Sequence, residues 1–179
     1  DRDKPLVVVV TSTFRKHTVT KLFGRWMQAL DRARVAVEAL DVGLVHDSTT
    51  ETLRGWCDAV HTAPGSPAQA LAALRSRAPD VVLFPEIGMD ARVLQVAGAR
   101  SAPLQLVAWG HPVTTGLPTI DGFVSSAAMA VEPDRTWTTE QRIDLPGIGV
   151  LVDPATAPPQ ADRSRFGLPS GRPLLLCVQ

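Results

Sequence analysis

Leu6-Val-Val-Val-Val10 is the stretch that decides the fold. Branched apolar residues follow one another here, without the polar alternation of a strand that faces water on one side. Such a run is typical of a central strand in a parallel sheet, because helices cover both faces of that sheet. Residues 11–16 follow as a polar turn, and an apolar stripe at three- and four-residue spacing then predicts a helix from His17 to about Leu30.

The same alternation of strand and helix continues to about residue 125. The expected strands cover residues 35–40, 59–61, 81–84, 103–109 and 122–125, with an edge strand at 142–146, and the expected helices cover 47–57, 66–77 and 92–99. Strands that alternate with helices at this rhythm imply right-handed βαβ units. We therefore predict an α/β, Rossmann-like fold with a mostly parallel, doubly wound sheet.

The pattern also predicts how the chain is divided. Residues 1–152 are expected to form one Rossmann-like lobe. Residues 153–172 are rich in proline and alanine and lack apolar periodicity over much of their length, which favours a linker. The apolar run in residues 173–179 is expected to be the first strand of a second lobe, so we interpret the chain as a piece of a longer protein.

Composition excludes several classes of partner. Lys plus Arg and Asp plus Glu balance at 18 each, so no general attraction to nucleic acid is expected. No apolar run is long enough to span a membrane, and no signal peptide is visible. Cys57 and Cys177 lie far apart among apolar residues, which indicates buried free thiols in a reducing compartment. The cytoplasm is the expected location.

Two candidate site residues follow predicted strands, whose carboxyl ends share one edge of a parallel sheet. His17 lies at or near a helix N-terminus, where the local positive potential should lower its pKa and leave a neutral ring able to accept a proton. The alternative is a solvated histidine at a helix start. Glu86 follows the strand at 81–84 as a candidate site carboxylate, whereas Asp90 is expected to cap the next helix.

The loop after the strand at 103–109 holds the remaining candidates. Two glycines and two prolines give it unusual backbone angles, and it carries one histidine and several hydroxyls. An ordinary connection whose threonines cap neighbouring backbone is the alternative to a binding loop. The candidate binding residues here are Gly110, His111, Thr114, Thr115 and Gly116.

Several familiar motifs are missing from the sequence. It contains no GxGxxG, no P-loop, no GxSxG, no HExxH and no paired metal-binding aspartates. Dinucleotide-dependent hydride transfer, ATP-driven chemistry and zinc hydrolysis are therefore disfavoured.

Spaced motifs in the middle of the chain resemble a known family. Trp109-Gly-His-Pro-Val-Thr-Thr-Gly-Leu-Pro-Thr-Ile-Asp121 and the neighbouring segments 88–90, 99–105 and 123–126 resemble the bacterial relatives of O-GlcNAc transferase. Phe14-Arg-Lys-His17 is similar to that family's histidine motif after the first strand. The resemblance extends over about residues 6–179, although Gly122 stands where the family commonly has an aromatic residue.

The resemblance implies the N-terminal, acceptor-side lobe of a GT-B fold. It implies an inverting glycosyltransferase that moves a sugar from a UDP-sugar to a protein side chain, with no cofactor and no metal. The missing C-terminal lobe would hold most of the nucleotide, and tetratricopeptide repeats often accompany such enzymes. His17 would then be a base or positioning group, and His111, Thr114, Thr115 and, more weakly, Glu86 would line the cleft.

Two alternatives remain open on the sequence. The chain could be a Rossmann-like domain that binds a ligand or partner without catalysis. It could also belong to another GT-B or epimerase-like enzyme that acts on small sugars or lipids. If the chain is part of a glycosyltransferase, this piece alone is expected to be inactive, because it would hold only half of the nucleotide pocket.

Overall fold

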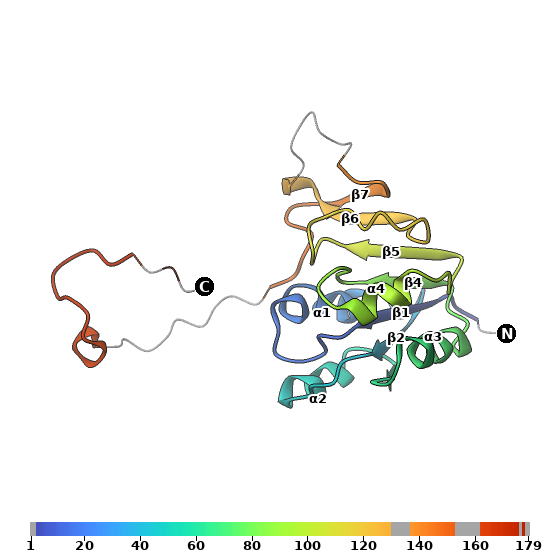
Figure 1. Cartoon of the computed structure of the whole chain (residues 1–179), viewed down its shortest axis with the longest axis horizontal. Helices are drawn as coiled ribbons and strands as arrows, with labels where there is room; N and C mark the ends of the chain where they lie inside the picture. Colours follow the sequence, from blue (N-terminus) through green and yellow to red (C-terminus); the bar gives the residue numbers. More distant parts are fainter. Residues whose placement is uncertain (1–2, 130–136, 153–161, 176, 178–179) are drawn as a thin grey trace.

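One seven-stranded sheet forms the body of the protein (Figure 1). The computed structural model describes residues 3–129, 137–152, 162–175 and 177. Every strand pair in the sheet is parallel, and the order is β3-β2-β1-β4-β5-β6-β7. The strands are β1 (Leu6–Thr11), β2 (Ala36–Asp41), β3 (Ala59–Thr62), β4 (Val81–Phe84), β5 (Leu104–Ala108), β6 (Gly122–Ser126) and β7 (Gln141–Leu145).

β1 is buried on both faces, as its sequence predicts. Leu6, Val8 and Val10 belong to one core cluster, whereas Val7 and Val9 belong to another on the opposite face. The strand period of two residues sends alternate side chains to the two sides. A run without polar residues is stable in this position because water reaches neither face.

Helices cover the two faces of the sheet in pairs. The helices are α1 (Thr18–Ala29), α2 (Ser48–Arg54), α3 (Pro67–Ser76) and α4 (Ala91–Ala97). Met27 of α1 and Leu53 of α2 pack into the cluster on one face, and Leu74 of α3 and Val93 of α4 pack into the cluster on the other. The prediction of a doubly wound α/β fold is confirmed.

The helix starts follow from local capping chemistry. The Asp47 carboxylate accepts from the backbone N–H groups of Thr49 and Thr50, and Ser66 and Asp90 cap α3 and α4 in the same way. These caps satisfy N–H groups that have no partner within the helix. The expected capping role of Asp90 is therefore confirmed.

The C-terminal part of the chain departs from two expectations. Residues 173–175 and 177 have no strand geometry, and the rest of the strand expected at 173–179 lies outside the described residues. A lone strand without a paired neighbour leaves its backbone groups unsatisfied, so β geometry is not expected there without a partner strand. Cys177 is exposed, against the expectation of burial, and Cys57 is half-buried.

The expected linker is only partly described. Residues 153–161 lie outside the described residues, and a short 3-10 turn covers Arg163–Phe166 within the remainder.

Candidate functional site

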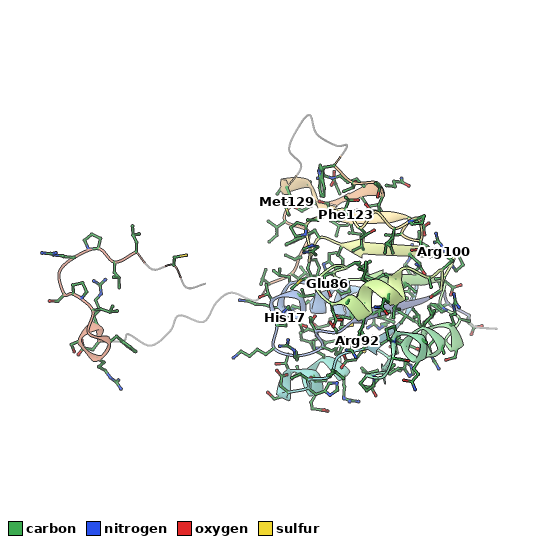
Figure 2. The ribbon with its side chains drawn as sticks, in the orientation of Figure 1. His17, Glu86, Arg92, Arg100, Phe123 and Met129 are labelled. Atoms are coloured by element: carbon green, nitrogen blue, oxygen red, sulfur yellow. The ribbon has the colours of Figure 1, made fainter. Side chains whose placement is uncertain are left out.

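A polar hollow lies at the point where the sheet reverses its strand order. β1 and β4 are neighbours in the sheet, and the helices that follow them pack on opposite faces. Ligands in open α/β sheets bind at such a reversal, beyond the carboxyl ends of the strands. The hollow here has a volume of about 290 Å³. Its lining includes His17 from the loop after β1, and Asp90 and Arg92 from the segment after β4. Figure 2 labels His17 and Arg92.

His17 caps the helix that it precedes. Its Nδ1 accepts a hydrogen bond from the backbone N–H of Val19 at 3.2 Å. Partial burial and the neighbouring charge of Arg15 lower the pKa of His17, so the ring is neutral near pH 7. In a neutral ring whose Nδ1 accepts, the proton is on Nε2. The nitrogen that remains for a ligand is therefore a hydrogen-bond donor.

The loop between β5 and β6 comes to the same edge of the sheet. The imidazole of His111 lies against Gly88, which follows β4 and has a φ of +119°. Gly110 donates its backbone N–H to the carbonyl of Pro85 at 3.1 Å. A Cβ on Gly110 would come within 2.4 Å of that carbonyl oxygen, so glycine is required for this approach. Gly110 thus has a packing role, which is independent of any ligand contact.

Aromatic packing joins α1 to this loop. Phe23 of α1 contacts Trp109 edge to face at a centroid separation of 5.0 Å. A Cβ on Gly110 would lie 3.1 Å from the ring of Phe23. Helix α1, which His17 caps, therefore packs against the start of the loop that contains His111.

Glu86 is a buried carboxylate with one unused oxygen. Its residue exposure is 1%, and its Oε2 accepts from the backbone N–H of Met89 at 3.0 Å. Its Oε1 has no hydrogen-bond partner among the described residues. Burial raises the pKa of Glu86, the hydrogen bond from Met89 opposes that rise, and the charge of Asp90 adds to it. The position suits a carboxyl group that holds a proton more readily than a solvated one.

Thr114 and Thr115 are held by Glu140. The two Glu140 carboxylate oxygens accept from the Thr114 hydroxyl at 2.7 Å and from the Thr115 backbone N–H at 2.8 Å, and the Thr115 hydroxyl also donates to it. Burial alone would raise the pKa of Glu140, but the hydrogen bonds from the two threonines outweigh it and lower the pKa. Both hydroxyl protons are therefore directed at Glu140. A ligand could hydrogen-bond directly to these hydroxyls only by donating to the threonine oxygens.

Comparison with known proteins identifies the fold. No family model and no curated protein matches the sequence. Among solved structures, a mutant of the O-GlcNAc transferase of Thermobaculum terrenum superposes with a TM-score of 0.69 at 20% sequence identity. The match covers 79% of this chain and 28% of that chain. The fold is that of an O-GlcNAc transferase lobe. The chain spans little more than a quarter of its structural neighbour.

Packing between neighbouring strands accounts for the glycine at residue 122. Gly122 begins β6, and a Cβ there would lie 2.8 Å from Cδ2 of Leu106 and 2.9 Å from Cδ1 of Ile143. The neighbouring strands thus fill the space that a larger residue at this position would need. The absence of an aromatic side chain at residue 122 is compensated by local packing.

Sequence reasoning missed parts of this candidate site. Arg92 lines the hollow and donates from its guanidinium to the backbone carbonyls of Pro64 and Val42. Glu140 is not among the candidate site residues that the sequence analysis names. No local signal marks either role, because the partners of both residues lie more than twenty positions away. Gly116 has a φ of +65° and a Cβ there would meet no atom within 4 Å, which is consistent with a turn.

No helix in the described part of the chain is long and apolar enough to cross a bilayer. No group of three or more His, Cys, Asp or Glu side chains in the same part of the chain is placed to hold a metal ion.

Proposed function

We propose that this chain forms the acceptor-side lobe of an inverting glycosyltransferase that transfers a sugar from a UDP-sugar to a protein side chain. The observation that carries the proposal is that His17 and the segment after β4 line one hollow at the reversal of strand order, in an O-GlcNAc transferase-like fold, with His111 packed against Gly88 of that same segment. Ligands bind at that place in open α/β sheets. The perturbed pKa values of His17 and Glu86 there also suit a functional site.

His17 acts in this proposal mainly as a hydrogen-bond donor. Its Nδ1 is engaged by Val19, so its Nε2–H is directed at an oxygen of the acceptor or of the departing diphosphate. A role as general base would first require the helix cap to break, because Nε2 carries the proton while the cap holds. The acceptor atom forms a bond to the anomeric carbon as that carbon's bond to the diphosphate breaks, UDP leaves with the bonding electrons, and the acceptor's proton passes to an oxygen of the departing UDP or to water.

The loop after β5 supplies the rest of the lobe's surface. His111, Gly110, Gly116 and the threonines would line the cleft that faces a second lobe. Thr114 and Thr115 would act largely by fixing the loop's shape, since Glu140 engages both hydroxyls. Glu86, placed below the loop, would donate from its unpartnered oxygen when protonated.

The remaining partners come from the resemblance. A second lobe of the same polypeptide would hold most of the nucleotide, tetratricopeptide repeats would help to bind the acceptor protein, and no metal would be required. The two unpaired thiols suit the reducing cytoplasm.

Glycosyl transfer by the full-length polypeptide tests the proposal. Incubation with UDP-GlcNAc or UDP-glucose and candidate acceptor peptides should give a mass increase of one sugar, and His17→Ala should lower turnover by roughly 10²-fold or more. Turnover that is unchanged in His17→Ala would remove His17 from the mechanism. Transfer to small sugars or lipids alone would favour the other enzyme class, and no transfer from any UDP-sugar would contradict the proposal.

A non-catalytic binding lobe is the second candidate. The observation that favours it is the engagement of Thr114 and Thr115 by Glu140, which leaves fewer polar groups for a substrate. Calorimetry with UDP separates the two: we expect very weak binding to residues 1–179 and clear binding to the full-length polypeptide. Absence of binding to both would favour the non-catalytic lobe.

A further inference from the structure

A second, larger hollow lies beside the first, between α1 and α2. It has a volume of about 560 Å³, and His17 lines both hollows, so the two meet at that residue. We call it the basic groove. Its cationic lining residues are Arg15, Lys16, Lys21 and Arg25, and no carboxylate belongs to its lining.

The charge of the groove is a local excess. The whole chain is balanced at 18 cationic and 18 acidic residues, yet residues 15–25 hold four cations and no acid. Arg15, Lys16 and Lys21 form no ion pair with any residue in the described part of the chain. Lys16 and Lys21 are exposed. Uncompensated cations in a concave site attract an acidic partner.

The floor of the groove is apolar and firmly set. Leu53 and Trp56 line it from the side of α2. A Cβ on Gly24 would lie 3.1 Å from the ring of Trp56, so the glycine allows α1 to approach this ring closely. A groove with an apolar floor and cationic walls matches a polypeptide, which offers both aliphatic stems and carboxylates.

The backbone at the start of α1 is not organised for a compact phosphate. The N–H of Val19 is donated to His17, and the N–H of Lys16 is donated to the Asp47 carboxylate at 2.8 Å. Phosphate sites at helix starts use such groups as converging donors. Here the exposed ammonium groups of Lys16 and Lys21 are the cationic donors that the groove presents.

Two of the cationic lining residues are spaced along α1. Lys21 and Arg25 are one helical turn apart, which places them about 6 Å from each other along α1. Alternate residues of an extended peptide are separated by about 6.6–6.8 Å. Acidic side chains on one face of an extended segment therefore match this spacing.

We propose that the basic groove binds an extended, acidic polypeptide segment and leads it past His17. The identity of that segment as the flank of the glycosylated residue rests on the function proposed above. The binding itself does not, because it follows from the charge and shape of the groove.

Fluorescence anisotropy with two labelled peptides tests the proposal on the whole protein. One peptide carries a central serine flanked by glutamates, and its twin carries glutamines in their place. We expect the acidic peptide to bind about tenfold more tightly at low salt, and the difference should shrink as ionic strength shortens the screening length. Lys21→Gln should weaken binding of the acidic peptide severalfold, and the double variant Lys16→Gln/Lys21→Gln should weaken it further. Neither variant should change the affinity for the glutamine peptide.

Arg34→Gln is the matched control. Arg34 precedes β2 at the opposite edge of the sheet and is also exposed, so its loss removes one positive charge without touching the groove. Equal affinity for the two peptides, or equal effects of Arg34→Gln and Lys21→Gln, would overturn the proposal. Displacement of the peptide by UDP or inorganic pyrophosphate, with loss of UDP binding in Lys21→Gln, would also overturn it and assign the groove to donor phosphates. If the protein prefers the acidic peptide but transfers no sugar, the groove is still a site for an acidic polypeptide, and only the proposed function is contradicted.

Discussion

The ring of His111 lies so close to Gly88 that a Cβ on the glycine would come within 2.8 Å of Cδ2 and 3.2 Å of Nε2. Gly88 follows β4 and His111 follows β5, so this contact joins two loops at the candidate site. Gly88 also has a φ of +119°, a backbone conformation that residues with a side chain rarely adopt. The position of His111 therefore depends on the absence of a side chain at residue 88.

Gly88→Ala should destabilise the protein by about 1–3 kcal/mol, because the alanine would be strained and would displace His111. Urea unfolding measures the change. Gly98→Ala is the control, since Gly98 has a φ of −64° and a Cβ there would meet carbonyl oxygens only at 3.5 Å. Similar losses in both variants would show that the contact with His111 is unimportant.

Glu140→Gln should destabilise the loop of Thr114 and Thr115 by about 1–3 kcal/mol at pH 7, because charge-assisted hydrogen bonds are replaced by weaker ones. The folded pKa of Glu140 is lowered, so its contribution is present above the ordinary glutamate pKa and is lost as pH falls through the folded value. The difference between the wild type and the variant should therefore shrink at acid pH. Glu51→Gln, which affects an exposed pair with Arg54, should change stability little at either pH.

Glu86→Gln should have the opposite pH dependence. The folded pKa of Glu86 is raised by burial, so its neutral form is favoured and its contribution is lost as pH rises through the folded pKa. The amide can still accept from Met89 and never ionises. The free energy of unfolding, measured at pH 5 and at pH 8, should be higher for the variant relative to the wild type at pH 8 than at pH 5. A pH-independent difference would mean that Glu86 is not the buried acid that titrates.

His17→Ala should cost about 1 kcal/mol of stability through loss of the cap on α1, whereas His17→Asn should retain most of it, because asparagine is a good N-cap residue. Both variants should lower glycosyl transfer, since neither reproduces the reach of Nε2–H. The pKa of His17 is lowered by burial and by Arg15, so acid that protonates the ring should weaken the cap as pH falls below the ordinary histidine value. Thermal unfolding from pH 8 to pH 5 checks this, and a wild-type transition that responds no more than that of His17→Asn would contradict it.

The sequence by itself determined the elements and the class of fold. The uninterrupted run Leu6–Val10 forms a strand covered on both faces, and Asp90 caps the helix that it precedes. These features depend on residues within a few positions of each other, so the local pattern contains the physical information that decides them. The placement of His17 at a helix start is of the same kind, whereas the lowering of its pKa comes first from burial, which the tertiary structure decides, and then from the neighbouring Arg15.

The tertiary structure alone decided which side chains meet. Glu140 binds Thr114 and Thr115 across about 25 positions, and His111 reaches Gly88 across 23, because the order of the strands brings their loops to one edge. Strand periodicity predicts which residues face a core, but it does not predict the order of the strands in the sheet. The cations of the basic groove lie together in residues 15–25, but its apolar floor depends on the tertiary structure, because Leu53 and Trp56 reach it from the side of α2, which covers the same face of the sheet as α1.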